Sequence, residues 1–199
     1  MDQTEKSERL RLFYAVELPE TVRQLAAAHI AHLGRAAPHG GVRFGRPENL
    51  HLTLKFLGEI EAHLQDAASR AAERATDGIE PFELRMEAAG AFPPRGPARV
   101  LWLGITDASG RLALLQERLE EECERENFPR EKRPFHPHIT IARLGRTSVA
   151  EARRLTRVHT ETEVRSDPFI ATEIILMKSE LGPGGSRYSP LSRYLLGRF

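Results

Sequence analysis

Two short motifs of the form His-x-Thr are the residues best suited to chemistry in this chain. The first is His51 with Thr53, and the second is His138 with Thr140. Because side chains alternate along a β-strand, each histidine shares a strand face with its threonine. If two such faces met across a cleft, a neutral imidazole could accept a proton from water and an imidazolium could protonate a leaving oxygen. The threonine hydroxyls could donate hydrogen bonds to a phosphate between them, so the pattern predicts phosphoryl chemistry that needs no metal.

A metal site is the main alternative use of these histidines. His136 and His138 could be two ligands on one strand face. However, no Asp or Glu lies near either motif, and the sequence has no HExxH or paired-cysteine pattern. We therefore expect no metal and no cofactor, with His136 as a neighbour of the site. The other histidines are interpreted as structural or solvated, without partners: His29, His32, His39, His63 and His159.

Basic residues gather beside the second motif, between residues 130 and 146. This stretch holds five cations and one acid, Glu131, in a chain that is otherwise nearly neutral. A guanidinium can bind a phosphate in bidentate fashion, so Arg133 and Arg143 are the candidates for substrate binding. The five cations are Arg130, Lys132, Arg133, Arg143 and Arg146.

The two residues that follow the first motif have opposite strand parity. Lys55 has the parity of His51 and Thr53, which makes it a weaker candidate for contact with phosphate. Phe56 has the opposite parity, which favours packing in the core over stacking on a base.

The two motifs belong to an internal duplication of the chain. Three landmarks recur in the same order, at an offset of 87 or 88 residues. This period is longer than that of solenoid repeats, which reach roughly 50 residues. We therefore expect two copies of one unit, roughly 11–97 and 99–199, that face each other across a cleft. The matched pairs are HLTLKFLG (51–58) with HITIARLG (138–145), Pro81-Phe82 with Pro168-Phe169, and RLFYAV from Arg11 with RVLWLG from Arg99.

The pattern of apolar residues predicts the same elements in both copies, helices packed on two mostly antiparallel sheets in an α+β fold. The sequence leaves open whether the N-terminal strand pairs with the C-terminal one, so that both ends complete one lobe. Strands are expected over 11–18, 50–57, 82–89, 100–105, 138–144 and 169–178, and helices over 20–33, 61–76, 107–126 and 148–158.

Composition limits the class of protein. The chain has 199 residues, of which 40% are hydrophobic and 29% charged, as in ordinary globular proteins. Its net charge of +1 gives no overall argument for nucleic acid, so any anion site must be local. The single cysteine, Cys123, lies in an acidic helical stretch and is expected to be a buried, inert thiol. The sequence lacks a signal peptide and any long apolar run, so we expect a cytoplasmic monomer without a membrane segment.

Together these segments resemble the 2H phosphoesterase superfamily, named for two H-x-T-x motifs. The nearer likeness is to its bacterial branch of RNA 2′,3′-cyclic phosphodiesterases, historically called RNA 2′-5′ ligases. The resemblance covers nearly the whole chain, and a longer polar N-terminus is the departure we note. It rests on RLFYAVELP, ENLHLTLKFLGE, AFPPRGPARVLWLGI, PFHPHITIARLG and a closing strand with Gly-Gly-Ser-Arg-Tyr.

The resemblance implies a fold, a reaction and roles for the motif residues. It implies one bilobal domain over 1–199, with a pseudo-twofold and a central cleft. The reaction is metal-independent opening of a terminal 2′,3′-cyclic phosphate to a 2′-phosphomonoester, with reverse 2′-5′ joining in some members. His51 would donate a proton to the leaving 3′ oxygen, and His138 would be the base that activates water. The partners would be RNA ends or nucleotides that carry the cyclic phosphate. The competing function is a nucleotide- or RNA-end-binding module without turnover, which the intact histidines disfavour.

Overall fold

The computed structural model describes residues 8–38, 40–182 and 185–197. These residues form four α-helices, two short 3₁₀-helices and nine strands. Along the chain the elements are β1 (Arg9–Glu17), α1 (Glu20–Ala36), β2 (Val42–Phe44), η1 (Pro47–Asn49), β3 (His51–Glu61), η2 (Ala62–Leu64), α2 (Gln65–Thr76), β4 (Phe82–Phe92), β5 (Val100–Thr106), α3 (Arg111–Arg125), β6 (His138–Leu144), α4 (Val149–Glu161), β7 (Phe169–Ala171), β8 (Glu173–Gly182) and β9 (Gly185–Leu195).

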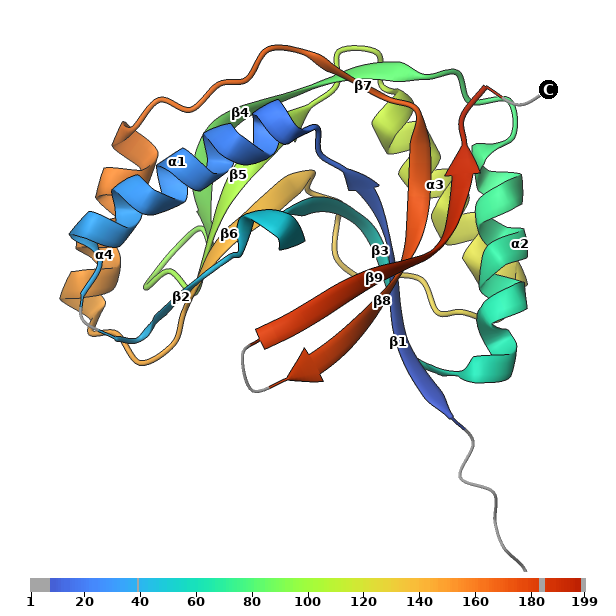
Figure 1. Ribbon diagram of the computed structural model, residues 1–199, viewed down its shortest axis with the longest axis horizontal. Coiled ribbons are helices and arrows are strands. Elements are labelled where there is room, and N and C mark those ends of the chain that lie inside the picture. The colour runs from blue at the N-terminus through green and yellow to red at the C-terminus, as the bar shows by residue number, and fades with distance from the viewer. Residues whose placement is uncertain (1–7, 39, 183–184, 198–199) are drawn as a thin grey trace, which may run out of the picture.

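The strands form two antiparallel sheets (Figure 1). Sheet A has the order β3-β1-β8-β9, and sheet B has the order β2-β6-β5-β4-β7. The expected α+β fold with two antiparallel sheets is therefore confirmed. The short strand β2 was not expected from the sequence.

The two ends of the chain meet in sheet A. Strand β1 pairs with β8, from Leu12 opposite Lys178 to Ala15 opposite Ile175. This settles the alternative that the sequence left open. The segment expected as one strand over 169–178 is two strands, because the chain leaves sheet B after β7 and enters sheet A as β8. Each sheet consequently contains strands from both sequence repeats.

The helices cover the two sheets in pairs (Figure 1). Helices α2 and α3 pack on each other and against β3, β8 and β9, whereas α1 and α4 pack on each other and against β4 and β6. Helix α3 begins at Arg111 rather than at Asp107, because the Asp107 carboxylate accepts hydrogen bonds from the N–H groups of Ser109 and Leu112. Its apolar stripe buries Cys123, and this burial raises the thiol pKa to about 11, as expected for an inert cysteine.

A buried pair of histidines joins α1 to α4. The carbonyls of Gly90 and Trp102 lie 3.1 and 3.0 Å from His159 Nε2, so this nitrogen must donate. His159 Nδ1 then accepts from His29 Nε2 at 2.8 Å. Burial lowers the pKa of His29 to about 4, so the pair is neutral at neutral pH.

The expectation that the remaining histidines lack partners is wrong for those that the structure describes. Besides the buried pair, His32 Nδ1 lies 3.2 Å from the Arg35 guanidinium, and His63 Nδ1 lies 3.2 Å from Glu61. His39 lies outside the described residues.

Within the described ranges, no helix is long and apolar enough to cross a membrane.

A small second apolar cluster lies on the face of sheet A opposite its main core. Phe13, Ala15, Ile175 and Met177 form it, and Tyr188 packs against it. Phe13 and Ala15 alternate along β1 with Leu12, Tyr14 and Val16, which point into the main core. The face of sheet A that carries Phe13 and Ala15, opposite the main core, is therefore apolar where it approaches the first motif.

Candidate active site

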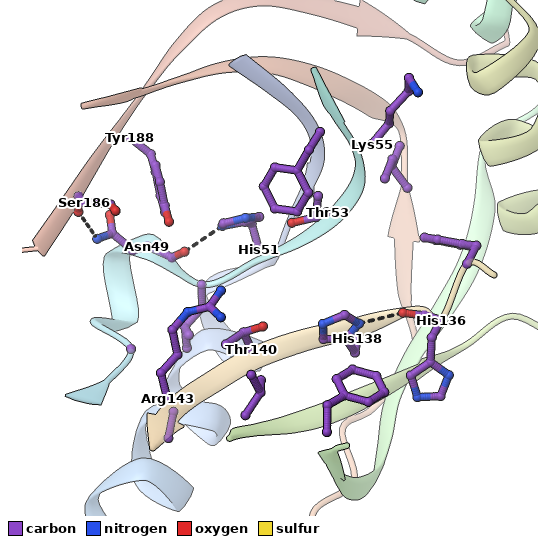
Figure 2. Close-up of a pocket in the computed structure, with 18 of the residues that line it drawn as sticks. Asn49, His51, Thr53, Lys55, His136, His138, Thr140, Arg143, Ser186 and Tyr188 are labelled. Atoms are coloured by element: carbon purple, nitrogen blue, oxygen red, sulfur yellow. Dashed lines mark hydrogen bonds between the residues drawn. The ribbon is translucent and has the colours of Figure 1, made fainter. Parts of the chain in front are cut away.

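Both His-x-Thr motifs line one cavity. Strands β3 and β6 contact each other, although they belong to different sheets. Between them lies a cavity of about 710 Å³ that His51, Thr53, His138 and Thr140 all line. Figure 2 shows the first pair on one wall and the second pair on the other, with the two strands running in opposite directions. The volume of this cavity is that of a typical small-ligand site.

Both motif strands contain a β-bulge at the same repeat position. In β3, Thr53 is opposite Ala15 and Lys55 is opposite Tyr14, which leaves Leu54 unpaired. In β6, the residues on either side of Ile141 pair with Trp102 and Leu101, which leaves Ile141 unpaired. Each bulge inserts one residue and reverses the alternation of faces beyond it.

The bulge overturns the interpretation of Lys55 and Phe56. Lys55 is 3% exposed, and its ammonium lies 2.6 Å from a Glu120 carboxylate oxygen and 2.8 Å from the Pro129 carbonyl. This ammonium is held in a buried ion pair and is not placed to bind phosphate. Phe56 is 54% exposed and lines the cavity on the face of His51. Strict alternation predicts the reverse for both residues.

Each catalytic candidate is oriented by the backbone two residues before it. His51 Nδ1 lies 2.7 Å from the Asn49 carbonyl, and His138 Nδ1 lies 2.6 Å from the His136 carbonyl (Figure 2). A carbonyl oxygen only accepts, so Nδ1 carries the hydrogen in both rings. Each Nε2 is then a base when the ring is neutral and an acid when it is protonated. His136 thus contributes a carbonyl to the orientation of His138.

Aromatic rings enclose both imidazoles. His51 packs on Phe13 at a centroid distance of 4.8 Å and on Tyr188 at 5.1 Å. His138 lies 5.2 Å from the Phe92 ring. Burial lowers the pKa of both histidines, against the opposing effect of their carbonyl hydrogen bonds. The charge of His138 further lowers the pKa of His51.

These pKa directions predict the pH dependence of any reaction that needs one acid and one base. If His51 must be protonated and His138 neutral, activity falls when both rings are neutral and when both are charged. Because both pKa values are lowered, we expect kcat/KM to be bell-shaped with its maximum below the ordinary imidazole value of 6.5. Rates measured between about pH 4.5 and about pH 8.5 test this, and a maximum in the alkaline range would contradict it.

The acid limb of this profile needs a control for unfolding. The pKa of His29 is lowered to about 4 in the folded chain, so the unfolded chain binds the proton more tightly. The stability that His29 contributes is present above pH 6.5 and is lost as the pH falls toward 4. Circular dichroism at each pH separates this loss from titration of the site.

The threonine hydroxyls are free to bind a ligand. Thr53 and Thr140 are both partly exposed toward the cavity. In the part of the chain that the structure describes, neither hydroxyl has a hydrogen-bond partner. The two groups can therefore donate to an anion between the strands.

The five cations near the second motif are placed differently from one another. Arg133 and Arg143 line the cavity, and the second bulge turns Arg143 to the face of Thr140. The Arg133 side chain is 89% exposed, and its Nε lies 3.7 Å from Glu131. Arg130 instead binds Glu117 and Glu124 on α3. Lys132 and Arg146 are exposed and are not among the described residues that line the cavity.

The described residues contain no group of three or more His, Cys, Asp or Glu side chains that could hold a metal ion. His136 and His138 have ring centroids 6.0 Å apart, and their rings pack on Phe92. Their immediate environment is thus aromatic rather than carboxylate.

Sequence reasoning missed several residues that shape the site. Asn49 stands 87 residues before His136, which is the offset of the duplication. The duplication was therefore a signal that the backbone carbonyls of these two residues are equivalent. The side chain of Asn49 also donates to the Ser186 carbonyl at 2.9 Å, which joins the first motif to β9. Tyr188 appeared only as part of the closing Gly-Gly-Ser-Arg-Tyr segment of the family resemblance, and its contact with His51 depends on the pairing of β9 with β8 and of β8 with β1.

Comparison with known proteins relates this chain to one family over most of its length. A model described as the 2′-5′ RNA ligase superfamily matches residues 16–183. A protein of Escherichia coli (strain K12) called RNA 2′,3′-cyclic phosphodiesterase is 35% identical over 193 residues, which cover 96% of this chain and 98% of that protein. A protein of the same name from Thermus thermophilus is 37% identical over 195 residues, covering 94% and 90%. The crystal structure of E. coli LigT complexed with 3′-AMP matches with a TM-score of 0.76 and 31% identity, covering 96% and 100%.

Proposed function

The chain belongs to the 2′-5′ RNA ligase superfamily, and we propose that it is an RNA 2′,3′-cyclic phosphodiesterase that opens a terminal cyclic phosphate to a 2′-phosphomonoester. The observation that carries this proposal is the pair of repeat-related motifs on facing strands. Each presents an imidazole Nε2 and a free hydroxyl to one cavity. The names of the relatives in E. coli and T. thermophilus support the same activity.

In the proposed mechanism the cyclic phosphate lies between β3 and β6. Nε2 of His138 takes a proton from a water molecule while the water oxygen attacks phosphorus. The bond from phosphorus to the 3′ oxygen breaks, and Nε2–H of His51 protonates that oxygen. The products are a 2′-phosphomonoester and a 3′ hydroxyl, and the two histidines have exchanged protonation states.

The remaining cavity residues are proposed to hold the substrate. Thr53 and Thr140 donate hydrogen bonds to the nonbridging oxygens, where charge increases during attack. Arg133 and Arg143 contribute positive charge along the second wall. Phe56 supports the terminal base, because its ring lines the cavity and is 54% exposed. Stacking on an exposed aromatic ring accepts any base, so this contact favours affinity over base selectivity.

The decisive experiment is hydrolysis of adenosine 2′,3′-cyclic phosphate in the presence of EDTA. We expect full turnover, because side chains of the protein supply all the proposed contacts, and phosphorus NMR should identify the product as the 2′ isomer. Activity that EDTA abolishes and zinc restores would replace the two-histidine mechanism with a metal-dependent one. Tight binding of the nucleotide without turnover would identify a binding module instead of an enzyme.

Three further properties are part of this proposal. The chain forms one bilobal domain, which is supported by a main core that contains residues of both sheets. It acts as a monomer, since one chain supplies both motifs. It acts in the cytoplasm, where a lone buried thiol such as Cys123 stays reduced. The same residues can join RNA ends through a 2′-5′ linkage when a 5′ hydroxyl replaces water as the nucleophile, because His138 can deprotonate this hydroxyl while His51 again protonates the leaving 3′ oxygen.

A further inference from the structure

A buried ion pair forms part of the cavity wall at the end where α3 contacts β3. Lys55 Nζ lies 2.6 Å from Glu120 Oε2, and the side chains of the two residues are only 1% and 6% exposed. The same carboxylate oxygen accepts a hydrogen bond from the Glu131 N–H at 3.1 Å, and the ammonium also donates to the Pro129 carbonyl at 2.8 Å. Both members of the ion pair line the cavity. The network thus joins β3 and α3 to the segment that leads into the second motif.

Glu120 also fixes the orientation of Gln116, which lies one helical turn earlier on α3. Gln116 Nε2 lies 3.1 Å from Glu120 Oε1. A carboxylate that is paired with an ammonium only accepts hydrogen bonds, so the amide nitrogen must face Glu120, which leaves the amide oxygen free. Gln116 is half-buried and lines the cavity, and among the residues that the structure describes its Oε1 has no hydrogen-bond partner. This wall therefore offers a ligand one oriented hydrogen-bond acceptor.

This end of the cavity suits a neutral, planar group better than an anion. Its charges are already paired, since Lys55 binds Glu120 and the Arg133 Nε lies 3.7 Å from Glu131. The exposed ring of Phe56, the next residue after Lys55 in β3, lines the same cavity. An aromatic ring that can stack on a base, together with a polar group that can bond to its edge, is the usual composition of a site for an unpaired nucleobase.

The position of Phe56 relative to His51 fits the dimensions of a nucleoside. The Phe13 ring lies 4.8 Å from the His51 ring and 5.7 Å from the Phe56 ring, measured between centroids. One ring therefore separates the imidazole from Phe56, just as one ribose separates a 2′,3′-cyclic phosphate from its base. Figure 2 shows Lys55 beyond Thr53 along the same wall. A cyclic phosphate held between the two histidines can thus place its base at the end of the cavity that holds the ion pair.

We propose that Gln116 determines base specificity: its Oε1 accepts a hydrogen bond from the exocyclic amino group of a terminal adenine or cytosine. This inference rests on the proposed function. Adenine and cytosine carry an amino donor on the pairing edge, where uracil and guanine carry a carbonyl oxygen that cannot donate. Stacking on Phe56 accepts any base, so the selection comes from Gln116. The buried pair of Lys55 and Glu120 holds the amide in the orientation that this contact needs.

The test compares two pairs of substrates. Adenosine 2′,3′-cyclic phosphate is compared with purine riboside 2′,3′-cyclic phosphate, which lacks only the amino group, and cytidine 2′,3′-cyclic phosphate is compared with the uridine compound. For the wild-type chain we expect kcat/KM to be about 3- to 10-fold higher for the amino-bearing member of each pair, the usual effect of one neutral hydrogen bond. The difference should lie mainly in KM, because the base contact is the same in the ground state and in the transition state.

Gln116→Met tests the residue, because methionine has a similar length and no amide oxygen. In this variant the two members of each pair should be hydrolysed with equal kcat/KM. Gln24→Met is the matched control. Gln24 is exposed on α1, donates to Glu20 over the same four-residue spacing at 3.0 Å, and does not line the cavity. It should keep the wild-type preference.

The outcomes distinguish this inference from the proposed function. If the wild-type chain hydrolyses both members of each pair equally well, the base contact is wrong while the enzyme stands, and this result needs no substitution. If Gln116→Met keeps the wild-type preference, or lowers kcat equally on all four substrates, Gln116 does not select the base. If the wild-type chain hydrolyses none of the four, the proposed function itself is wrong.

Discussion

His51→Ala and His138→Ala are each expected to reduce hydrolysis of a 2′,3′-cyclic nucleotide by about 10³- to 10⁴-fold, near the upper range for loss of one acid or base. The double variant should be little worse than either single one. The reason is that the two rings act in one step, and groups that act together are strongly non-additive. His63→Ala is the control, because His63 is exposed on η2, does not line the cavity and should not change the rate.

The two single variants should differ on a substrate with a better leaving group. Catechol cyclic phosphate opens to release a phenol, which needs little help from an acid. We therefore expect it to restore much of the rate to His51→Ala but not to His138→Ala, which still lacks the base. Rescue of His138→Ala alone would exchange the two roles and keep the site. A flat pH profile together with rescue of neither variant would reduce the histidines to phosphate ligands.

The residues of the site could be predicted from sequence because the duplication marks them twice. A single His-x-Thr strand carries little information, but the recurrence of both residues at the repeat offset has no explanation in packing. The same offset relates Asn49 to His136, whose carbonyls orient the two rings. The chemistry of the pair was therefore readable from the chain, whereas the assignment of donor and acceptor depended on family resemblance.

Strand alternation failed at the bulge in each of the two motif strands. The burial patterns of β3 and β6 begin identically, with two consecutive buried residues at the bulge. In β3 this buries Lys55, and it exposes Phe56 to the cavity. A pattern of period two cannot reveal an inserted residue. Alternation also cannot show that Lys55, a charged residue, is buried, because its burial depends on Glu120 on α3, which accepts a hydrogen bond from its ammonium group. Such an ion pair between distant segments leaves no local signal.

The exchange of strands between the repeats was also beyond the sequence. Periodicity identifies β8 as a strand but does not indicate that it leaves the sheet of β7 to pair with β1. This exchange places the apolar cluster of Phe13 and Tyr188 against His51. The lowered pKa of His51 therefore arises from long-range topology, which explains why motif analysis alone places both histidines near the ordinary imidazole value.

Thr53→Val and Thr140→Val should each lower kcat by about 10²- to 10³-fold, the usual effect of losing one donor to a developing negative charge. Valine keeps the shape of threonine and removes only the hydroxyl. KM should change little, because these hydrogen bonds are expected to strengthen most in the transition state, where the nonbridging oxygens carry the most charge. The thermal midpoint should be retained, since both side chains are partly exposed and in the described structure neither hydroxyl bonds to another residue.

The matched controls are Thr53→Ser and Thr140→Ser, which retain the hydroxyl and should keep most of the activity. Serine lacks the γ-methyl group, so a structural role of the side chain would appear as equal losses in the serine and valine series. If the hydroxyl acts as a hydrogen-bond donor, kcat of the valine variants should be about 10²- to 10³-fold lower than kcat of the serine variants. A wild-type kcat in the Thr53→Val/Thr140→Val double variant would remove both hydroxyls from the mechanism. Charge stabilisation would then have to come from cavity cations such as Arg133 and Arg143.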